Sequence, residues 1–209
     1  MALTYDQGRK HRLLVLPALF TEANALRRQT AEVMYRLDLS GIDSFLPDFP
    51  GCNESLQPLQ SQTLGGWRAA ARKAGEHFQA THVLTLRGGA LLAPQSLPGW
   101  RYAPTTGAKI LRSLLRARTI AAREAGRTET IDELAIKART DGVELAGWMF
   151  GTDLFAALEQ AIANEDSQQA IIGQDTIGGS GLWLRAEPGD SPEQADALAA
   201  LITMGMLEQ

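Results

Sequence analysis

Residues 82–93, "HVLTLRGGALLA", combine an apolar run, two glycines and a second apolar run. This order predicts a strand, a tight turn and the start of a helix. Such a turn exposes backbone N–H groups at a helix N-terminus and can present a reactive side chain at its apex. Here the apex is Arg87, whose guanidinium is permanently protonated and cannot act as a nucleophile. The chemistry predicted for this turn is therefore the binding of negative charge.

Two interpretations of Arg87 follow from its charge. In the first, its forked donors and the backbone at Gly88 and Gly89 bind an anionic group, that of a phosphosugar, a lipid phosphate or an acyl carboxylate. In the second, Arg87 forms an ion pair with Asp48 or Glu22 from the neighbouring loops and closes the turn. The residues alone do not decide between binding and closure.

The other roles of a serine hydrolase find no candidates. Such an enzyme needs an acid and then a histidine after its nucleophile. None of the three histidines follows the turn: His11, His77 and His82. Ser55 is interpreted as a helix cap, and Asp175 as a turn residue although a triad acid could lie there. We therefore predict no catalytic residue and keep Asp48, Ser55 and Asp175 as secondary site residues.

The composition is that of one globular domain, with 209 residues of which 44% are hydrophobic and 21% charged. A net charge of −4 argues against nucleic acid as a partner. Cys52 is the only cysteine, which excludes an intramolecular disulfide and a cysteine-based metal site and fits the cytoplasm. We expect no metal, no cofactor and no membrane span, and a homodimer stays open.

Strands and helices alternate through the first half of the chain. Strands are predicted within 12–20, 42–55, 81–89 and 98–104, and helices over 21–41 and 66–80. This order predicts a mainly parallel sheet with helices on both faces. The loops that follow the first three strands should meet at one edge of the sheet, where proteins of this class bind ligands. These loops are 17–20, 48–55 and 87–89.

The second half predicts more helix than strand. Helices are expected over 107–126, 130–142, 152–164 and 191–207, and strands at 143–151, 169–175 and 181–187. The predicted caps are Thr128 or Thr130, Thr152 or Asp153, and Ser191. We predict a single domain over 1–209, with a helical lid-like insertion at 105–165.

Three loops resemble those of α/β-hydrolases. "DFPGCNES" at 48–55 is similar to the D-x-x-G-x-G-x-S loop of that class. "TLRGG" at 85–89 occupies the register of G-x-S-x-G, with Arg87 in the serine position. "PALFTEANALRRQ" stands where the class has its oxyanion loop, which places Leu19, Phe20 and Glu22 beside the turn. The resemblance implies a shortened α/β-hydrolase-like fold that is degenerate at the nucleophile.

A more specific resemblance is to the hydrolase-like proteins associated with exosortase A systems in exopolysaccharide-producing bacteria. It is carried by "LFTEANALRR", "LPDFPGCNES", "LRGGALLA", "TGAKILRSLLRAR" and "VELAGW". It implies a bacterial protein that binds an anionic ligand or a partner in such a pathway, without a serine triad. Two alternatives stay open: an atypical esterase or thioesterase that acts on an acyl substrate, and a structural or scaffolding component.

The predicted helix at 107–123 carries a basic stripe opposite an apolar one. Its members fall within a narrow arc at helical spacing: Lys109, Arg112, Arg116 and Arg123. A solvated outer face is the favoured interpretation. Peripheral contact with anionic lipid headgroups is the sharper alternative.

Overall fold

The computed structural model describes residues 1–165, 167–185 and 187–208. Its centre is a six-stranded sheet in the order β1-β3-β2-β4-β5-β8, in which only β1 runs antiparallel to its neighbour. The strands are β1 (Ala2–Tyr5), β2 (Arg12–Leu16), β3 (Asp43–Pro47), β4 (His82–Leu86), β5 (Gly99–Tyr102) and β8 (Gln169–Ile172). The predicted mainly parallel sheet is confirmed.

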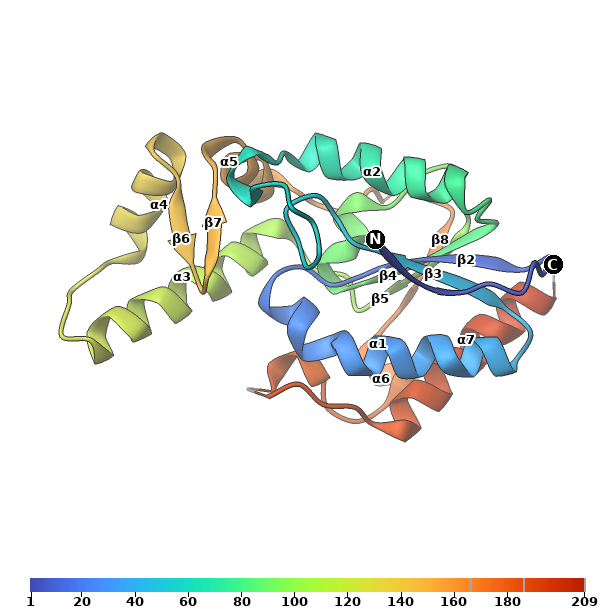
Figure 1. The fold of residues 1–209 in the computed structure, drawn as a ribbon. Coiled ribbons are helices and arrows are strands. Elements are labelled where there is room, and N and C mark those ends of the chain that lie inside the picture. The colour runs from blue at the N-terminus through green and yellow to red at the C-terminus, as the bar shows by residue number, and fades with distance from the viewer. Residues whose placement is uncertain (166, 186, 209) are drawn as a thin grey trace.

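Helices cover both faces of this sheet, as Figure 1 shows. On one face, α1 (Thr21–Leu39) packs beside α7 (Pro192–Leu207), with the short α6 (Gln174–Ile177) next to them. On the other face lie α2 (Leu64–His77) and the 3₁₀ helix η2 (Arg87–Leu92). Buried strand residues divide between the two faces, because successive side chains of a strand point to opposite sides.

The segment between β5 and β8 forms a separate layer at one end of the sheet (Figure 1). It contains α3 (Gly107–Glu124), α4 (Ile131–Thr140), the hairpin β6 (Val143–Leu145) and β7 (Trp148–Phe150), and α5 (Thr152–Gln160). Thr106 caps α3, and Thr130 forms a capping box with Glu133 at the start of α4. All of these elements fall within residues 105–165, for which a lid-like insertion stays a prediction.

Several local predictions are wrong. Residues 143–151 form a hairpin because Ala146 and Gly147 both have positive φ, at 50° and 82°, which is the geometry of a two-residue turn. Within 181–187, the described residues hold the 3₁₀ helix η3 (Leu182–Leu184) in place of a strand, and Ala186 lies outside the described residues. Helix α5 begins after Gly151 without the predicted side-chain cap.

The two outer strands also differ from the sequence prediction. Strand β1 was not predicted, and β8 is only partly buried, with Ile171 68% exposed. Both are edge strands, so each has only one neighbour and weaker hydrophobic patterning. No helix in the described parts of the chain is both long and apolar enough to cross a membrane.

Candidate functional site

The turn after β4 has the sharp geometry that the sequence predicts. Leu86 is extended, with φ −106° and ψ 123°, and Arg87 follows in the left-handed region with φ 51°. A bulky residue occupies this region only when its surroundings hold it there. Arg87 is the first residue of η2 and directly follows β4, so it stands at the carboxyl edge of the sheet.

Gly88 and Gly89 pack against neighbouring elements. A Cβ on Gly89 would lie 2.5 Å from the carbonyl oxygen of Pro17, and one on Gly88 would lie 2.7 Å from Cδ1 of Ile110. The loop after β2 and helix α3 therefore fill the space beside the turn. Both glycines are buried and are required by close packing. Anion binding at their backbone stays a prediction.

The Arg87 side chain is enclosed by polar and aromatic partners. Its Nε and Nη2 donate to the two carboxylate oxygens of Glu22, at 3.2 and 2.9 Å. Its Nη1 donates to the carbonyl oxygen of Ala103 at 2.7 Å, and its guanidinium carbon lies 4.1 Å from the ring centre of Trp183. Only 15% of the side chain is exposed. Of the two ion-pair partners that the sequence suggests, the structure selects Glu22.

Leu19 and Phe20, predicted in an oxyanion-like loop, are buried. Phe20 has φ 56° and ψ −126°, a strained conformation that directs its ring into an aromatic cluster. The ring centre lies 5.9 Å from that of Trp67, 5.6 Å from that of Trp148 and 4.7 Å from that of Phe150. Phe20 thus connects the edge of the sheet to the hairpin of the inserted segment.

The secondary site residues do not join Arg87. Asp48 accepts a hydrogen bond from Nδ2 of Asn53 at 2.9 Å, within its own loop. The hydroxyl of Ser55 accepts from the backbone of Gly51 at 3.0 Å, so the predicted cap is wrong, and Thr63 caps α2 instead. Asp175 is exposed in the first turn of α6.

His11 and His82 lie at the other end of the strands, and His77 is the last residue of α2. His82 begins β4 and stacks on Trp100 with ring centres 5.8 Å apart, and His11 precedes β2. The length of β4, about 13 Å at 3.3 Å per residue, separates His82 from the turn. Burial and the charge of Asp48 raise the pKa of Cys52 to about 12, so it is no thiolate at neutral pH.

Sequence reasoning missed Trp183 and Ala103, which complete the enclosure of Arg87. Ala103 contributes a backbone carbonyl, for which the sequence has no signal. Trp183 falls in a segment whose apolar pattern predicts a strand. Among the described residues, no group of three or more His, Cys, Asp or Glu side chains could hold a metal ion. The four cations of the α3 stripe are exposed.

Comparison with known proteins identifies the fold. No family model and no curated protein matches the sequence. Among solved structures, the chain is similar to mouse alpha/beta hydrolase domain-containing protein 10, with a TM-score of 0.59 and 11% identity over 99% of this chain and 93% of that one. It is also similar to Est1E from Butyrivibrio proteoclasticus with bound ferulic acid, with a TM-score of 0.58 and 12% identity over 100% and 94%. The protein therefore has an α/β-hydrolase fold.

Proposed function

We propose that this protein binds an anionic ligand or a partner, and that it does not hydrolyse esters through a Ser-His-Asp triad. The observation that carries the proposal is the state of Arg87. At the turn where the α/β-hydrolase resemblance places a nucleophile, the chain has a guanidinium that is paired with Glu22 and stacked on Trp183. A paired guanidinium has no nucleophilic atom that could accept an acyl group from an ester.

Closure of the turn is the first part of the proposal. Glu22 occupies two donors of Arg87, and the carbonyl of Ala103 occupies a third. An anion reaches this guanidinium only by replacing Glu22, and it would have to supply both hydrogen bonds of that carboxylate. We infer that in the resting protein Arg87 fastens α1 to the end of β4.

The inserted segment is the second part. We propose that residues 105–165 act as a fixed cap over this edge of the sheet. Phe20 supports this role because its ring packs against Trp148 and Phe150 of the hairpin. Close backbone contact at Gly107, where a Cβ would lie 2.0 Å from the carbonyl oxygen of Leu158, joins α3 to α5 within the cap. A cap held in this way presents a constant outer surface to a partner.

A role in an exopolysaccharide pathway associated with exosortase A systems is proposed from the sequence resemblance alone. Its strongest support lies in "TGAKILRSLLRAR" and "VELAGW", which are not general hydrolase motifs. These motifs form the start of α3 and the turn of the hairpin, so both belong to the proposed cap.

The test is a panel of p-nitrophenyl esters and acyl thioesters of increasing chain length, assayed with wild type and Arg87→Ala. We expect no turnover above the buffer rate with either protein. Turnover by the wild type that disappears in Arg87→Ala would contradict the proposal and favour an atypical esterase or thioesterase. Circular dichroism of both proteins is the control, because loss of the Glu22 pair lowers stability without any change in activity.

A further inference from the structure

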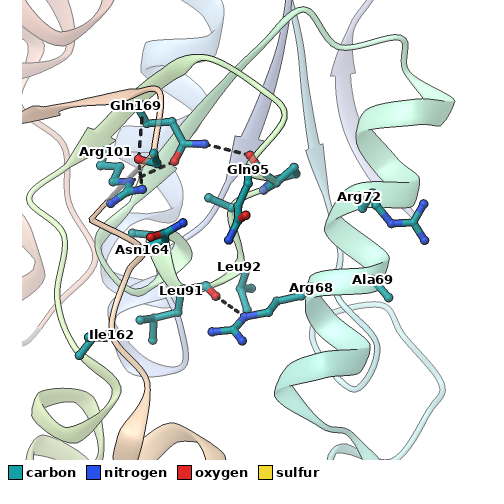
Figure 2. Close-up of a pocket in the computed structure, with 14 residues that line it drawn as sticks. Arg68, Ala69, Arg72, Leu91, Leu92, Gln95, Arg101, Ile162, Asn164 and Gln169 are labelled. Carbon is teal, nitrogen blue, oxygen red and sulfur yellow. Dashed lines mark hydrogen bonds between the residues drawn. The ribbon is translucent and has the colours of Figure 1, made fainter.

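A second arginine site lies on the α2 face of the sheet and is lined in part by the end of η2, whereas the Arg87 side chain packs against Glu22 and Trp183. It is a pocket of about 460 Å³ between α2, the segment after η2 and the chain that leads into β8 (Figure 2). Its polar lining includes Arg68, Arg101, Gln95, Asn164 and Ser167. The charged residues among its described lining are all arginines.

Arg101 is the buried cation of this pocket. It is 4% exposed, and its Nε donates to Oε1 of Gln169 at 3.0 Å, while its Nη2 donates to the hydroxyl of Ser167. No carboxylate of the described chain pairs with it. Burial lowers its pKa, because the charged form loses hydration without gaining an opposite charge. A buried guanidinium with neutral acceptors alone favours an added anion.

Gln169 holds Arg101 in one orientation. The side-chain amide of Gln169 donates to the carbonyl oxygens of Pro94 and Leu97, at 2.9 and 3.0 Å. These two bonds direct Oε1 of Gln169 toward the guanidinium. The cation is therefore positioned before any ligand arrives, which reduces the entropy cost of binding.

Arg68 supplies a second guanidinium from another element. Its Nε donates to the carbonyl oxygen of Leu91 at 2.9 Å, and its two outer nitrogens have no hydrogen-bond partner among the described residues. Figure 2 shows the Arg68 side chain extending from α2 toward the side of the pocket that holds Asn164 and Arg101. The Arg72 side chain points away in the same view and pairs with Glu76 at 2.6 Å.

A buried threonine on the neighbouring strand lies on the same face as Arg101. Thr85 of β4 is the register partner of Arg101 on β5, so both side chains lie on one face of the sheet. Thr85 is fully buried, and its hydroxyl has no hydrogen-bond partner within the described chain. A buried hydroxyl without a partner costs stability, but Thr85 lies outside the pocket lining and is a neighbour of Arg101, not a ligand-contacting group.

We propose that this pocket binds the phosphoryl group of a small polar ligand of sugar-phosphate size. Two guanidiniums from different elements suit a doubly charged anion with several oxygens. The volume fits a small molecule, and the amide and hydroxyl groups of Gln95, Asn164 and Ser167 suit the hydroxyls of a sugar. This inference rests on the proposed function, which it deepens by naming the site and the class of ligand.

The test measures binding by calorimetry at low ionic strength. Four probes separate the sources of recognition: glucose 1-phosphate, inorganic phosphate, glucose and glucuronate. We expect glucose 1-phosphate to bind most tightly, inorganic phosphate more weakly, and glucose and glucuronate at least tenfold more weakly than glucose 1-phosphate. Affinity should fall as salt rises. Absence of binding by both phosphates would overturn the inference.

Variants locate the site. Arg68 is exposed, so Arg68→Ala should fold normally and weaken glucose 1-phosphate at least tenfold. Lys73→Ala is the matched control, because it removes the same charge from α2 outside the pocket lining and should stay within twofold. Arg101→Gln is the second variant, with its fold checked by thermal melting. Phosphate binding that survives Arg68→Ala and is lost in Arg87→Ala would overturn the pocket and leave the proposed function standing.

Two further outcomes separate the proposals. Ester turnover together with phosphate binding that depends on Arg68 would overturn the proposed function and support the pocket. Asp166, next to Ser167 in the sequence, lies outside the described residues. Binding within twofold in Asp166→Asn supports the inference. A tightening of more than tenfold would show that a carboxylate of the chain itself neutralises the pocket, which would overturn it.

Discussion

Arg87 and Arg101 stand near the ends of adjacent strands and are both largely buried, yet their surroundings differ. Arg87 has the carboxylate of Glu22, a backbone carbonyl and an aromatic face. Arg101 has an amide oxygen and a hydroxyl, and within the described residues no carboxylate. The first charge is neutralised by Glu22, whereas the second has no opposite charge from the residues that the structure describes. In this α/β-hydrolase fold, the turn after β4 therefore holds a paired arginine, whereas the arginine beside the α2 pocket has only neutral partners among the described residues.

The largest expected difference is in thiol reactivity, between the sheet edge that holds Cys52 and the pocket beside Arg101. Cys52 lies in the loop after β3, at the closed edge, and burial with the nearby Asp48 charge raises its pKa from 9.0 to about 12. At pH 8 its thiolate fraction, and hence its alkylation rate, should be about 10³-fold below that of an ordinary thiol. Because the shift is upward, the rate should rise about tenfold per pH unit from 8 to 10 without levelling off. Iodoacetamide labelling followed by mass spectrometry measures this.

The matched control places a cysteine in the open pocket. Gln95 is exposed and lines that pocket, so Gln95→Cys in a Cys52→Ser background should be labelled rapidly at pH 8. Equal rates at the two positions would show that the edge near Cys52 is as open as the pocket. Guanidinium chloride should make both thiols react quickly, since the pKa shift of Cys52 depends on the folded state.

The second difference is in how well the packed turn at Gly89 and the start of α2 at Gly65 tolerate an added methyl group. Gly89→Ala should lower the free energy of unfolding by about 3 kcal/mol, because the new methyl meets the backbone of Pro17 and Leu16. Gly65→Ala is the control, since its nearest neighbour beyond the helix backbone is 4.0 Å away and alanine favours a helix. Urea unfolding of both variants measures the difference. A loss below 1 kcal/mol for Gly89→Ala would mean that the turn has free space beside it.

The sequence predicts the positions that local patterns define. The apolar run before Arg87, the glycines after it and the capping residues of α4 and α7 all act over a few residues, and the elements they predict are present. The state of the site depends on distant contacts. Glu22 is 65 residues from Arg87, and Gln169 is 68 residues from Arg101. Only the tertiary fold therefore gives one arginine a carboxylate and the other, among the described residues, an amide and a hydroxyl.

The third contrast is the ion pair itself. Glu22→Gln removes the opposite charge from a guanidinium that is only 15% exposed, and should cost about 1–2 kcal/mol of stability. In a double-mutant cycle with Arg87→Gln, the two losses should be non-additive by about 1 kcal/mol. Glu54→Gln, at an exposed loop position, is the control and should be neutral. Additive losses would mean that Arg87 and Glu22 do not stabilise one another.

If a phosphorylated ligand binds at Arg101 and not at Arg87, its binding should not depend on the ion pair between Arg87 and Glu22. Thermal melting of wild type and Glu22→Gln with glucose 1-phosphate should show the same upward shift in Tm, because ligand binding at Arg101 adds to stability independently of Glu22. A shift that grows in Glu22→Gln would instead show that the anion binds at the freed Arg87.

The smallest effect is expected from substitutions on α3, whose cations are exposed and lie neither at the Arg87 turn nor in the pocket beside Arg101. Lys109, Arg112, Arg116 and Arg123 are exposed, and the apolar side of their helix is buried inside the protein, where it has no surface left to enter a bilayer. Changing all four to glutamine should alter stability by less than about 1 kcal/mol, because each charge keeps its hydration. We expect equal sedimentation of wild type and variant with phosphatidylserine vesicles at 0.15 M salt. Sedimentation of the wild type but not of the variant would contradict this expectation. It would show that the exposed cations of α3 are sufficient for contact with anionic lipid.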